Sequence, residues 1–182
     1  MRSKFAQLFD WFYFLAFPNP ETRQSLDNNI RYVSIQNLGL LVSLDTEQFM
    51  IKINNIQPEL ERCLKTDKDN SVVIHVLRLI KTFGKCGHSY IEDNPGQMES
   101  ERRLLHFWLN ILKPGLMDSI EARNCPVLKA ALCNCIAEVG GKIFCALPTD
   151  RRMLAVTLMV SLCDCVTISI FIQHRFIEFF FN

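Results

Sequence analysis

Glycine and proline are scarce in this sequence, with seven of each among 182 residues. An all-β sandwich or barrel needs a turn roughly every ten residues, so this shortage argues against that class. Hydrophobic residues make up 49% and charged residues 21%, which fits a globular protein and is too apolar for a disordered one. The length favours one domain with room for a sizeable core.

An excess of charge of either sign is also missing. The chain has 20 Lys and Arg residues and 19 Asp and Glu residues, which gives a formal net charge of +1. A nucleic-acid-binding protein needs a basic excess or a basic stripe to neutralise phosphates. The even balance therefore gives no reason to expect a nucleic-acid partner.

The short motifs of common active sites are absent. The sequence has no G-x-S-x-G, H-E-x-x-H, Rossmann fingerprint or EF-hand loop. Val139–Lys142 reads VGGK, which lacks the spaced glycine and the following Ser or Thr of a phosphate loop. Cys86 and His88 are close in sequence, but a nucleophile and its base also need an orienting group and a pocket. We expect no enzymatic activity and no cofactor, and keep an enzyme or metal protein built on Cys and His as a competing class.

Eight cysteines are present. Disulfide frameworks belong mostly to chains too short to build a core, so we expect reduced thiols in an intracellular protein, cytoplasmic or nuclear. Cys133 and Cys135 fall two residues apart on an expected helix and so point about 200° from each other. They cannot hold one metal ion together, and no second pair with zinc spacing exists. We predict that these cysteines, and Cys163 and Cys165, are core residues, and that Cys145 packs in a turn between helices.

Apolar residues recur at helical spacing along the chain. In three segments, residues at offsets of 0, 4, 8 and 11 fall on one side of a helix that turns about 100° per residue. The three sets are Ile30, Ser34, Leu38 and Leu41; Val72, Val76, Ile80 and Phe83; and Leu128, Leu132, Ile136 and Val139. Their first members are 42 and then 56 residues apart. The shared phase predicts three related helices.

A second apolar helix follows each of these segments, in Glu47–Lys65, Glu99–Lys113 and Pro148–Leu162. The residues expected to face inward are Phe49, Ile53, Ile56, Leu60 and Leu64 in the first of these, and Leu104, Leu105, Trp108, Leu109 and Leu112 in the second. Breaks are expected as well. Pro58 should kink or split its helix, Thr149 should cap the third helix, and Gly84 and Gly140 should end helices. Residues 86–98 should then form a loop insert.

Two-helix units that recur about every 40 residues are the signature of HEAT and armadillo repeats. We predict an all-α fold, a HEAT/armadillo-type α-solenoid of about three helix pairs over residues 25–164. An irregular helical bundle with a coincidental phase is the alternative. Stacked helix pairs present a curved surface to other proteins, so the predicted function is a non-enzymatic protein-binding scaffold.

Both ends of the chain are apolar. Residues 1–24 contain MRSKFAQLFDWFYFLAF, which we set apart as an apolar helix or segment; Asp10 and the lack of a cleavage site argue against a signal peptide. Residues 165–182 form a second apolar tail. Met153–Ile172 is long enough to span a bilayer, with Asp164 as its only charge, so a membrane-anchored helical protein is the alternative function.

Two arginine pairs, Arg102/Arg103 and Arg151/Arg152, stand at the starts of second helices. If the helix pairs stack in register, all four side chains lie near one edge, where they could receive an acidic segment of a partner protein. A solvated helix end is the simpler interpretation. Arginine near a helix N-terminus is unfavourable with the helix dipole, which favours the partner interpretation. These four are the predicted partner-binding residues.

Two stretches, CPVLKAALCNCIAEV (residues 125–139) and ALPTDRRMLAVTLMVSLCD (residues 146–164), match a known pattern. They resemble the central region of the HEAT repeat-containing protein 6 family, which carries P-x-L-x-A-x-x-C-[DN]-x-[LI], then L-P-x-D-R and an apolar helix ending near an Asp. The matching residues are Pro126, Leu128, Ala130, Cys133, Asn134, Ile136, Leu147, Pro148, Asp150, Arg151 and Asp164. Including looser matches in earlier repeats, the likeness covers about Asp27 to Asp164.

The resemblance implies an intracellular α-solenoid without recognised enzymatic activity, and a packing role for Cys133. After Asp164 the family continues with a further basic and alanine-rich repeat, whereas this chain reads CVTISIFIQHRFIEFFFN. The first 17 residues have no counterpart either. We therefore expect a truncated or partial piece of a longer solenoid, whose tail could be translated from non-coding sequence.

Overall fold

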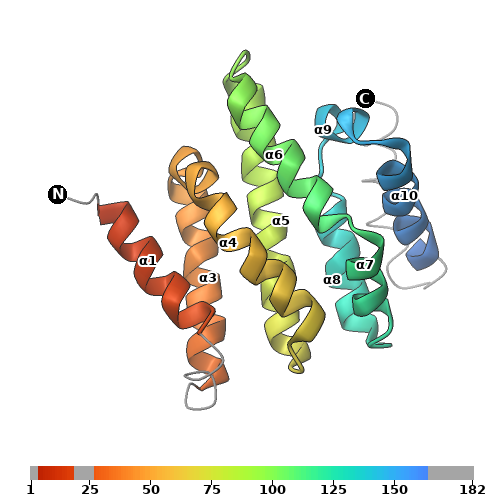
Figure 1. Cartoon of the computed structure of the whole chain (residues 1–182), viewed down its shortest axis with the longest axis horizontal. Helices are drawn as coiled ribbons and strands as arrows, with labels where there is room; N and C mark the ends of the chain where they lie inside the picture. The colour runs from red at the N-terminus through yellow and green to blue at the C-terminus, as the bar shows by residue number, and fades with distance from the viewer. Residues whose placement is uncertain (1–3, 19–26, 164–182) are drawn as a thin grey trace.

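The computed structural model describes residues 4–18 and 27–163, and side chains as far as Ser161. Over these ranges the chain is helical and has no strand, so the all-α prediction is confirmed. The helices are α1 (Lys4–Ala16), α3 (Asn28–Leu44), α4 (Thr46–Thr66), α5 (Asn70–Asp93), α6 (Met98–Ile111), α7 (Pro114–Glu121), α8 (Pro126–Ile136), α9 (Gly141–Ala146) and α10 (Thr149–Cys163). They follow one another along the long axis of the molecule (Figure 1).

Aspartates at the junctions explain where three of the helices begin. Asp27, Asp45 and Asp69 stand immediately before α3, α4 and α5, and each carboxylate accepts a hydrogen bond from a backbone N–H of the first turn. Such caps satisfy donors that a helix start leaves open and contribute about 1 kcal/mol each. Because Asp45 alone separates α3 from α4, these two helices turn back on each other.

Helices α3, α5 and α8 form one row and run in the same direction (Figure 1). Between α3 and α5, the contacts join start to start and end to end. Tyr32 stacks on His75 near the starts, and Ser43 Oγ, near the end of α3, lies 3.8 Å from Sγ of Cys86 in the second half of α5. The loop before α8 likewise reaches the start of α5, through a hydrogen bond from Arg123. The three helices that share a phase in the sequence therefore share a row in space.

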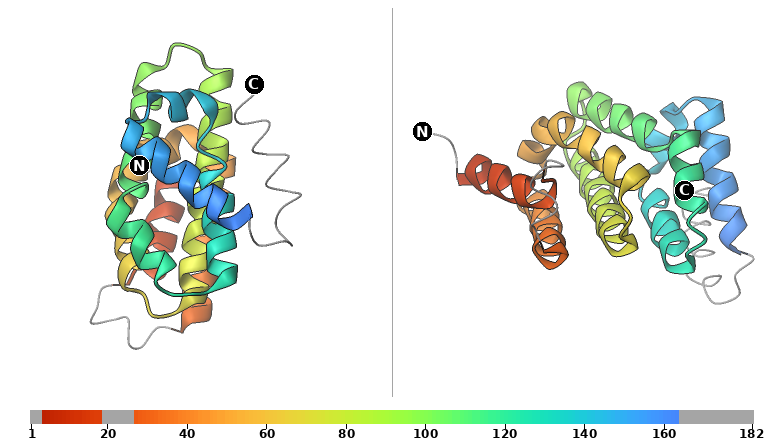
Figure 2. Two further views of the ribbon diagram at one scale, coloured as in Figure 1. Left: turned by 90° about the vertical axis from the view of Figure 1, so that its right-hand side faces the viewer. Right: turned by 60° about the horizontal axis from the view of Figure 1, so that its bottom comes forward.

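Helices α4 and α6 form a second row packed against the first, as the end-on view in Figure 2 shows. These two helices are also parallel. Arg103 Nη1 of α6 donates to the Met50 carbonyl near the start of α4 (3.4 Å), and Lys113 Nζ lies 3.1 Å from Glu61 Oε2 nearer its end. Two helix pairs, α3–α4 and α5–α6, thus repeat the same arrangement side by side.

A run of aromatic rings connects the helices through the core. Ring centroids lie 5.6 Å apart for Phe9–Phe49 and Phe49–Phe83, 4.7 Å for Phe83–Phe107 and 5.6 Å for Phe107–Trp108. Edge-to-face and tilted pairs of this kind contribute roughly 0.5–1.5 kcal/mol beyond their burial. The run begins in α1 and passes through α4 and α5 to α6, so α1 shares one core with the helices that follow it.

Most residues predicted to face inward are buried. This holds for all of the second and third phased sets and for the five residues predicted in α4, whereas Leu105 and Leu109 of α6 are only partly buried. In the first set Ile30 is 44% exposed, and that prediction was wrong. Its neighbour Arg31 takes the buried place because its guanidinium is paired there with Asp67.

Gly84 does not end a helix. Helix α5 runs through it to Asp93, so the predicted loop insert shrinks to residues 94–97. A Cβ atom at Gly84 would lie 2.6 Å from Cζ2 of Trp108 on α6 and 3.1 Å from the Glu138 carbonyl. The glycine serves the close approach of helices rather than a turn. Gly140 does not end α8 either, because α8 stops at Ile136; Gly140 stands directly before α9, with φ at +78°, a backbone conformation that favours glycine.

Two other expectations about helix limits need correction, and two helices were missed. Pro58 does not split α4, which continues through it as one helix. Thr149 is the first residue of α10 rather than its cap, because the Pro148 carbonyl accepts the N–H groups of Arg151 and Arg152. The short helices α7 and α9 were not predicted at all.

The predicted apolar tail at residues 165–182 lies outside the described residues, and so does most of the second half of Met153–Ile172. Among the helices that the structure describes, none combines the length and the apolar character that crossing a bilayer requires.

We expect Gly84→Ala to destabilise the fold by about 1–3 kcal/mol, because the added methyl group overpacks a rigid indole. The gain in helix propensity, at most about 1 kcal/mol, does not offset this cost. Gly115→Ala is the matched control, since a Cβ there meets nothing within 4 Å and the residue lies in α7. Urea unfolding followed by circular dichroism measures both variants. Equal stability of the two would contradict the close packing described here.

Candidate functional site

The two predicted arginine pairs do not share an edge. Arg102 and Arg103 lie in the first turns of α6, whereas Arg151 Nη1 donates to the Leu112 carbonyl just beyond its other end (2.8 Å). Nine residues of helix separate these places, a rise of about 14 Å. Helix α9 packs near the start of α6, where its Lys142 forms an ion pair with Glu101. Helix α10 therefore does not stack on α6 in the register that we expected. The common edge that we expected is therefore not formed.

The arginines are also engaged within the chain. Arg102 and Arg103 lie 2.8 Å and 2.9 Å from the carboxylate of Glu99, and the hydrogen bond from Arg103 is the largest cause that lowers the pKa of Glu99. Arg103 and Arg151 bind backbone carbonyls as well, and Arg152 binds the Thr149 hydroxyl. Arg102, at 78% exposed, is the member of the four that a partner could reach most easily.

The cysteines are mainly packing residues. Cys133 and Cys135 are buried as predicted, and burial is the main cause that raises the pKa of the Cys135 thiol well above its ordinary value. A thiol held neutral in this way is a poor nucleophile. Cys145 is exposed, so its predicted packing was wrong: it lies on the outer side of α9. Cys163 and Cys165 fall beyond the side chains described.

Cys86 and His88 do not form a catalytic pair. Both lie on the continuous helix α5, where positions two apart point about 200° from each other. The His88 ring lies instead 3.2 Å from the Glu92 carboxylate one turn further along. Across the described part of the chain, no group of three or more His, Cys, Asp or Glu side chains is placed to hold a metal ion.

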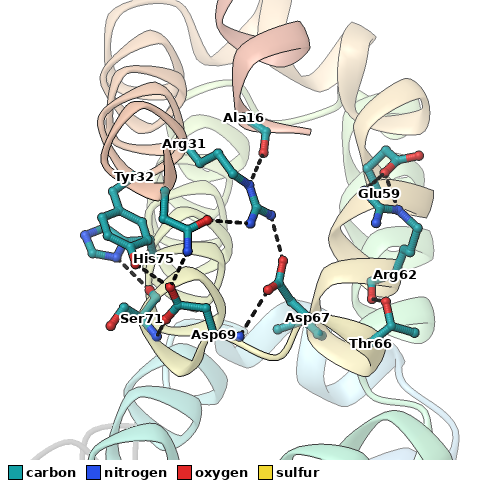
Figure 3. A network of polar contacts seen from close by, with 12 residues as sticks. Ala16, Arg31, Tyr32, Glu59, Arg62, Thr66, Asp67, Asp69, Ser71 and His75 are labelled. Carbon is teal, nitrogen blue, oxygen red and sulfur yellow. Dashed lines mark hydrogen bonds and ion pairs between the residues drawn. The ribbon is translucent and has the colours of Figure 1, made fainter. Parts of the chain in front are cut away.

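The main polar cluster of the core joins three helices (Figure 3). Arg31 Nη2 of α3 lies 2.6 Å from Asp67 Oδ2 in the α4–α5 junction, and the two side chains are 2% and 3% exposed. Arg31 also donates to the Asn28 amide oxygen and, at 3.5 Å, to the Ala16 carbonyl at the end of α1. A buried ion pair is tolerated only when further hydrogen bonds satisfy its members. These bonds fix α1, α3 and the α4–α5 junction relative to one another.

A second polar cluster lies beside it, between the starts of α3 and α5. The Tyr32 hydroxyl donates to Asp69 Oδ2 at 2.5 Å, and the Tyr32 ring stacks on His75 with centroids 5.0 Å apart. Partial burial acts to raise the pKa of Asp69, but hydrogen bonds from Tyr32 and from the Ser71 and Val72 N–H groups outweigh it and lower that pKa. The carboxylate is therefore charged at neutral pH and holds α3 to the cap of α5.

A groove of about 230 Å³ continues from this cluster along the seam between α3 and α5. Its lining residues are Ile35, Gln36, Gly39, Leu40 and Ser43 of α3 and His75, Arg78, Leu79 and Thr82 of α5. Pockets for drug-sized ligands are typically larger, roughly 300–1,000 Å³, and enclose most of the ligand. The groove instead fits one or two side chains of a larger molecule, which makes it the candidate interaction site.

Sequence reasoning did not identify this groove or the clusters that shape it. One signal was present, because Arg31 stands one helical turn before the buried Ile35 and two turns before the buried Leu38. A charged residue in an apolar phase indicates a buried partner. Asp67 and Asp69, two residues apart at a helix junction, were the available partners.

No protein family model matches the chain, and no solved structure matches it.

We expect Tyr32→Phe to destabilise the fold by about 1 kcal/mol at neutral pH, because Asp69 loses a hydrogen bond to its charged form. The pKa of Asp69 is lower in the folded state, so its stabilisation is complete above the unfolded value of about 3.9 and is lost as the pH falls through the folded value. The difference between wild type and variant should therefore shrink below about pH 4.

Tyr90→Phe is the matched control for this measurement, because the Tyr90 hydroxyl donates to the neutral amide oxygen of Gln97. Its effect should not change over the same acid range. Chemical denaturation from pH 3 to pH 7 measures all three proteins. A Tyr32→Phe effect that stays constant with pH would show that the bond to Asp69 does not stabilise the fold.

Proposed function

We propose that the chain is a segment of a HEAT-like α-solenoid that acts as a non-enzymatic protein-binding scaffold. In such a protein each helix pair contacts mainly its neighbours, and the stack presents a preformed, extended surface to a partner. No side chain would perform covalent chemistry; the shape and charge of the surface would select the partner. As part of this proposal, the chain is related to the HEAT repeat-containing protein 6 family that its sequence resembles.

One observation carries the proposal: within each row, contacts between neighbouring helices join residues at a nearly constant offset in the sequence. Contacts along α3 and α5 join residues 39 and 43 positions apart, as in Gln36–His75 and Ser43–Cys86. Contacts along α4 and α6 join residues 53 and 52 apart, as in Arg103–Met50 and Lys113–Glu61. Parallel packing at a nearly fixed offset within each row is what stacked repeats produce, and a bundle with a coincidental phase would not require it.

The third pair fits the proposal less closely. Helix α8 takes its place in the first row, but the short helix α9 comes between it and α10, whereas α4 and α6 directly follow their first helices. Within the proposal, Arg102 is the predicted partner-binding arginine with the most exposed side chain. Arg103, Arg151 and Arg152 donate hydrogen bonds within the chain, so we expect them to contribute less to partner binding than Arg102 does.

Affinity capture with the intact chain, followed by direct binding of each purified candidate, tests the scaffold function. We expect at least one protein to bind with a Kd of about 1 µM or tighter, equivalent to about −8 kcal/mol. Hydrogen exchange should then show protection on one face of the stack while the core amides stay unchanged. If no captured protein binds the purified chain directly, the scaffold proposal fails. Arg102→Glu tests the arginine prediction, which fails if the affinity is unchanged.

A further inference from the structure

The part of the outer face of α5 that borders the groove carries positive charge without matching negative charge. Six residues, Ser71, His75, Arg78, Thr82, Lys85 and Ser89, recur three or four positions apart and so lie along one side of the helix. Arg78 and Lys85 are exposed, and no ion pair of either is found among the described residues. Between Ser71 and Ser89 no Asp or Glu lies on this face; Glu92 and Asp93 continue it only in the last turn of α5, beyond the groove.

Cations on the second row are arranged differently. Arg62 pairs with Glu59, Lys113 with Glu61, and Arg102 with Glu99, all at 2.7–3.1 Å. Those surfaces are neutralised within the chain. The face of α5 keeps its charge available for a partner, which gives it electrostatic complementarity to an acidic surface.

An apolar strip runs beside this charge. Leu40 of α3 is 61% exposed at the wall of the groove, and the buried side chains of Ile35 and Leu79 lie beneath it. A Cβ built at Gly39 would lie 3.9 Å from Leu79 Cδ1, which is an ordinary contact, so only a larger side chain at this position would fill the groove. An exposed apolar wall with a row of cations along one side is complementary to an amphipathic helix that carries acidic residues beside its apolar face.

We propose that the α3–α5 groove binds an acidic amphipathic helix of a partner protein. This inference rests on the scaffold function and names the chemistry of the partner. Apolar side chains of the helix would lie against Leu40, above the floor that Ile35 and Leu79 form, and carboxylates along its edge would pair with Arg78 and Lys85. These two cations are seven residues apart, about 10.5 Å along α5, so carboxylates at positions i and i+7 of the partner match them.

The test uses the full chain and a labelled peptide of about 18 residues, five helical turns, with leucines on one face and glutamates on the other. Fluorescence anisotropy at low salt measures its affinity beside two control peptides. One has the same composition in scrambled order, and the other has lysine in place of glutamate. We expect the acidic amphipathic peptide to bind at least about tenfold more tightly than either control, a difference of about 1.4 kcal/mol.

Variants of the chain locate the site. Arg78→Glu combined with Lys85→Glu should weaken binding at least about tenfold, and Gly39→Leu should block it by filling the groove. The matched controls lie outside the groove: a charge reversal, Lys65→Glu, and Gly115→Leu in α7, where an added Cβ meets nothing within 4 Å. Both should bind as wild type does. Far-ultraviolet circular dichroism and unfolding midpoints confirm that all variants are folded.

The proposal is overturned if the scrambled peptide binds equally well, or if Arg78→Glu/Lys85→Glu and Gly39→Leu retain wild-type affinity. The natural partner separates this failure from failure of the scaffold function. A captured protein that binds wild type and the groove variants equally would refute the groove and leave the scaffold standing. The absence of any directly bound protein would refute the scaffold itself.

Discussion

The buried ion pair between Arg31 and Asp67 is the interaction on which the arrangement of the first helices depends. Both side chains are almost fully excluded from solvent, so each charge would be costly without the other. The pair and its added hydrogen bonds join α3 to the end of α1 and to the α4–α5 junction. The position of α3 against α5, and hence the groove between them, follows from this contact.

The two seams along the first row differ in how closely the helices approach. At Gly84, α5 is in contact with Trp108 and with the Glu138 backbone that follows α8, which leaves no room for even a methyl group. Between α3 and α5, the stacked rings of Tyr32 and His75 and the hydrogen bond from Gln36 fill one part of the seam, and the groove occupies the next. The seam at Gly84 is thus closely packed, whereas the α3–α5 seam is open and is bordered by Arg78 and Lys85, which form no ion pair among the described residues.

Sequence periodicity predicted the helical class and most of the core, because burial of one face imposes a 3.6-residue period that is local and readable. Periodicity failed where a contact with a residue far away in the sequence determines the position of a side chain. Gly84 indicates a helix end in sequence but serves the contact with Trp108, and Ile30 gives its buried place to Arg31. The arginine edge failed for the same reason, since the position of α9 against α6 decides where α10 begins. The groove depends on the spacing between α3 and α5, which the pattern of residues within a single helix does not reveal.

A double-mutant cycle on Arg31→Met and Asp67→Asn tests the central claim most directly. Methionine keeps much of the volume of the arginine, and asparagine keeps an acceptor for the Asp69 N–H. Each single change should cost about 3–5 kcal/mol, because it leaves a buried polar group or charge without its partner. The double change should cost about 2–3 kcal/mol less than the sum of the two. Strictly additive losses would show that the pair does not hold α3 in place.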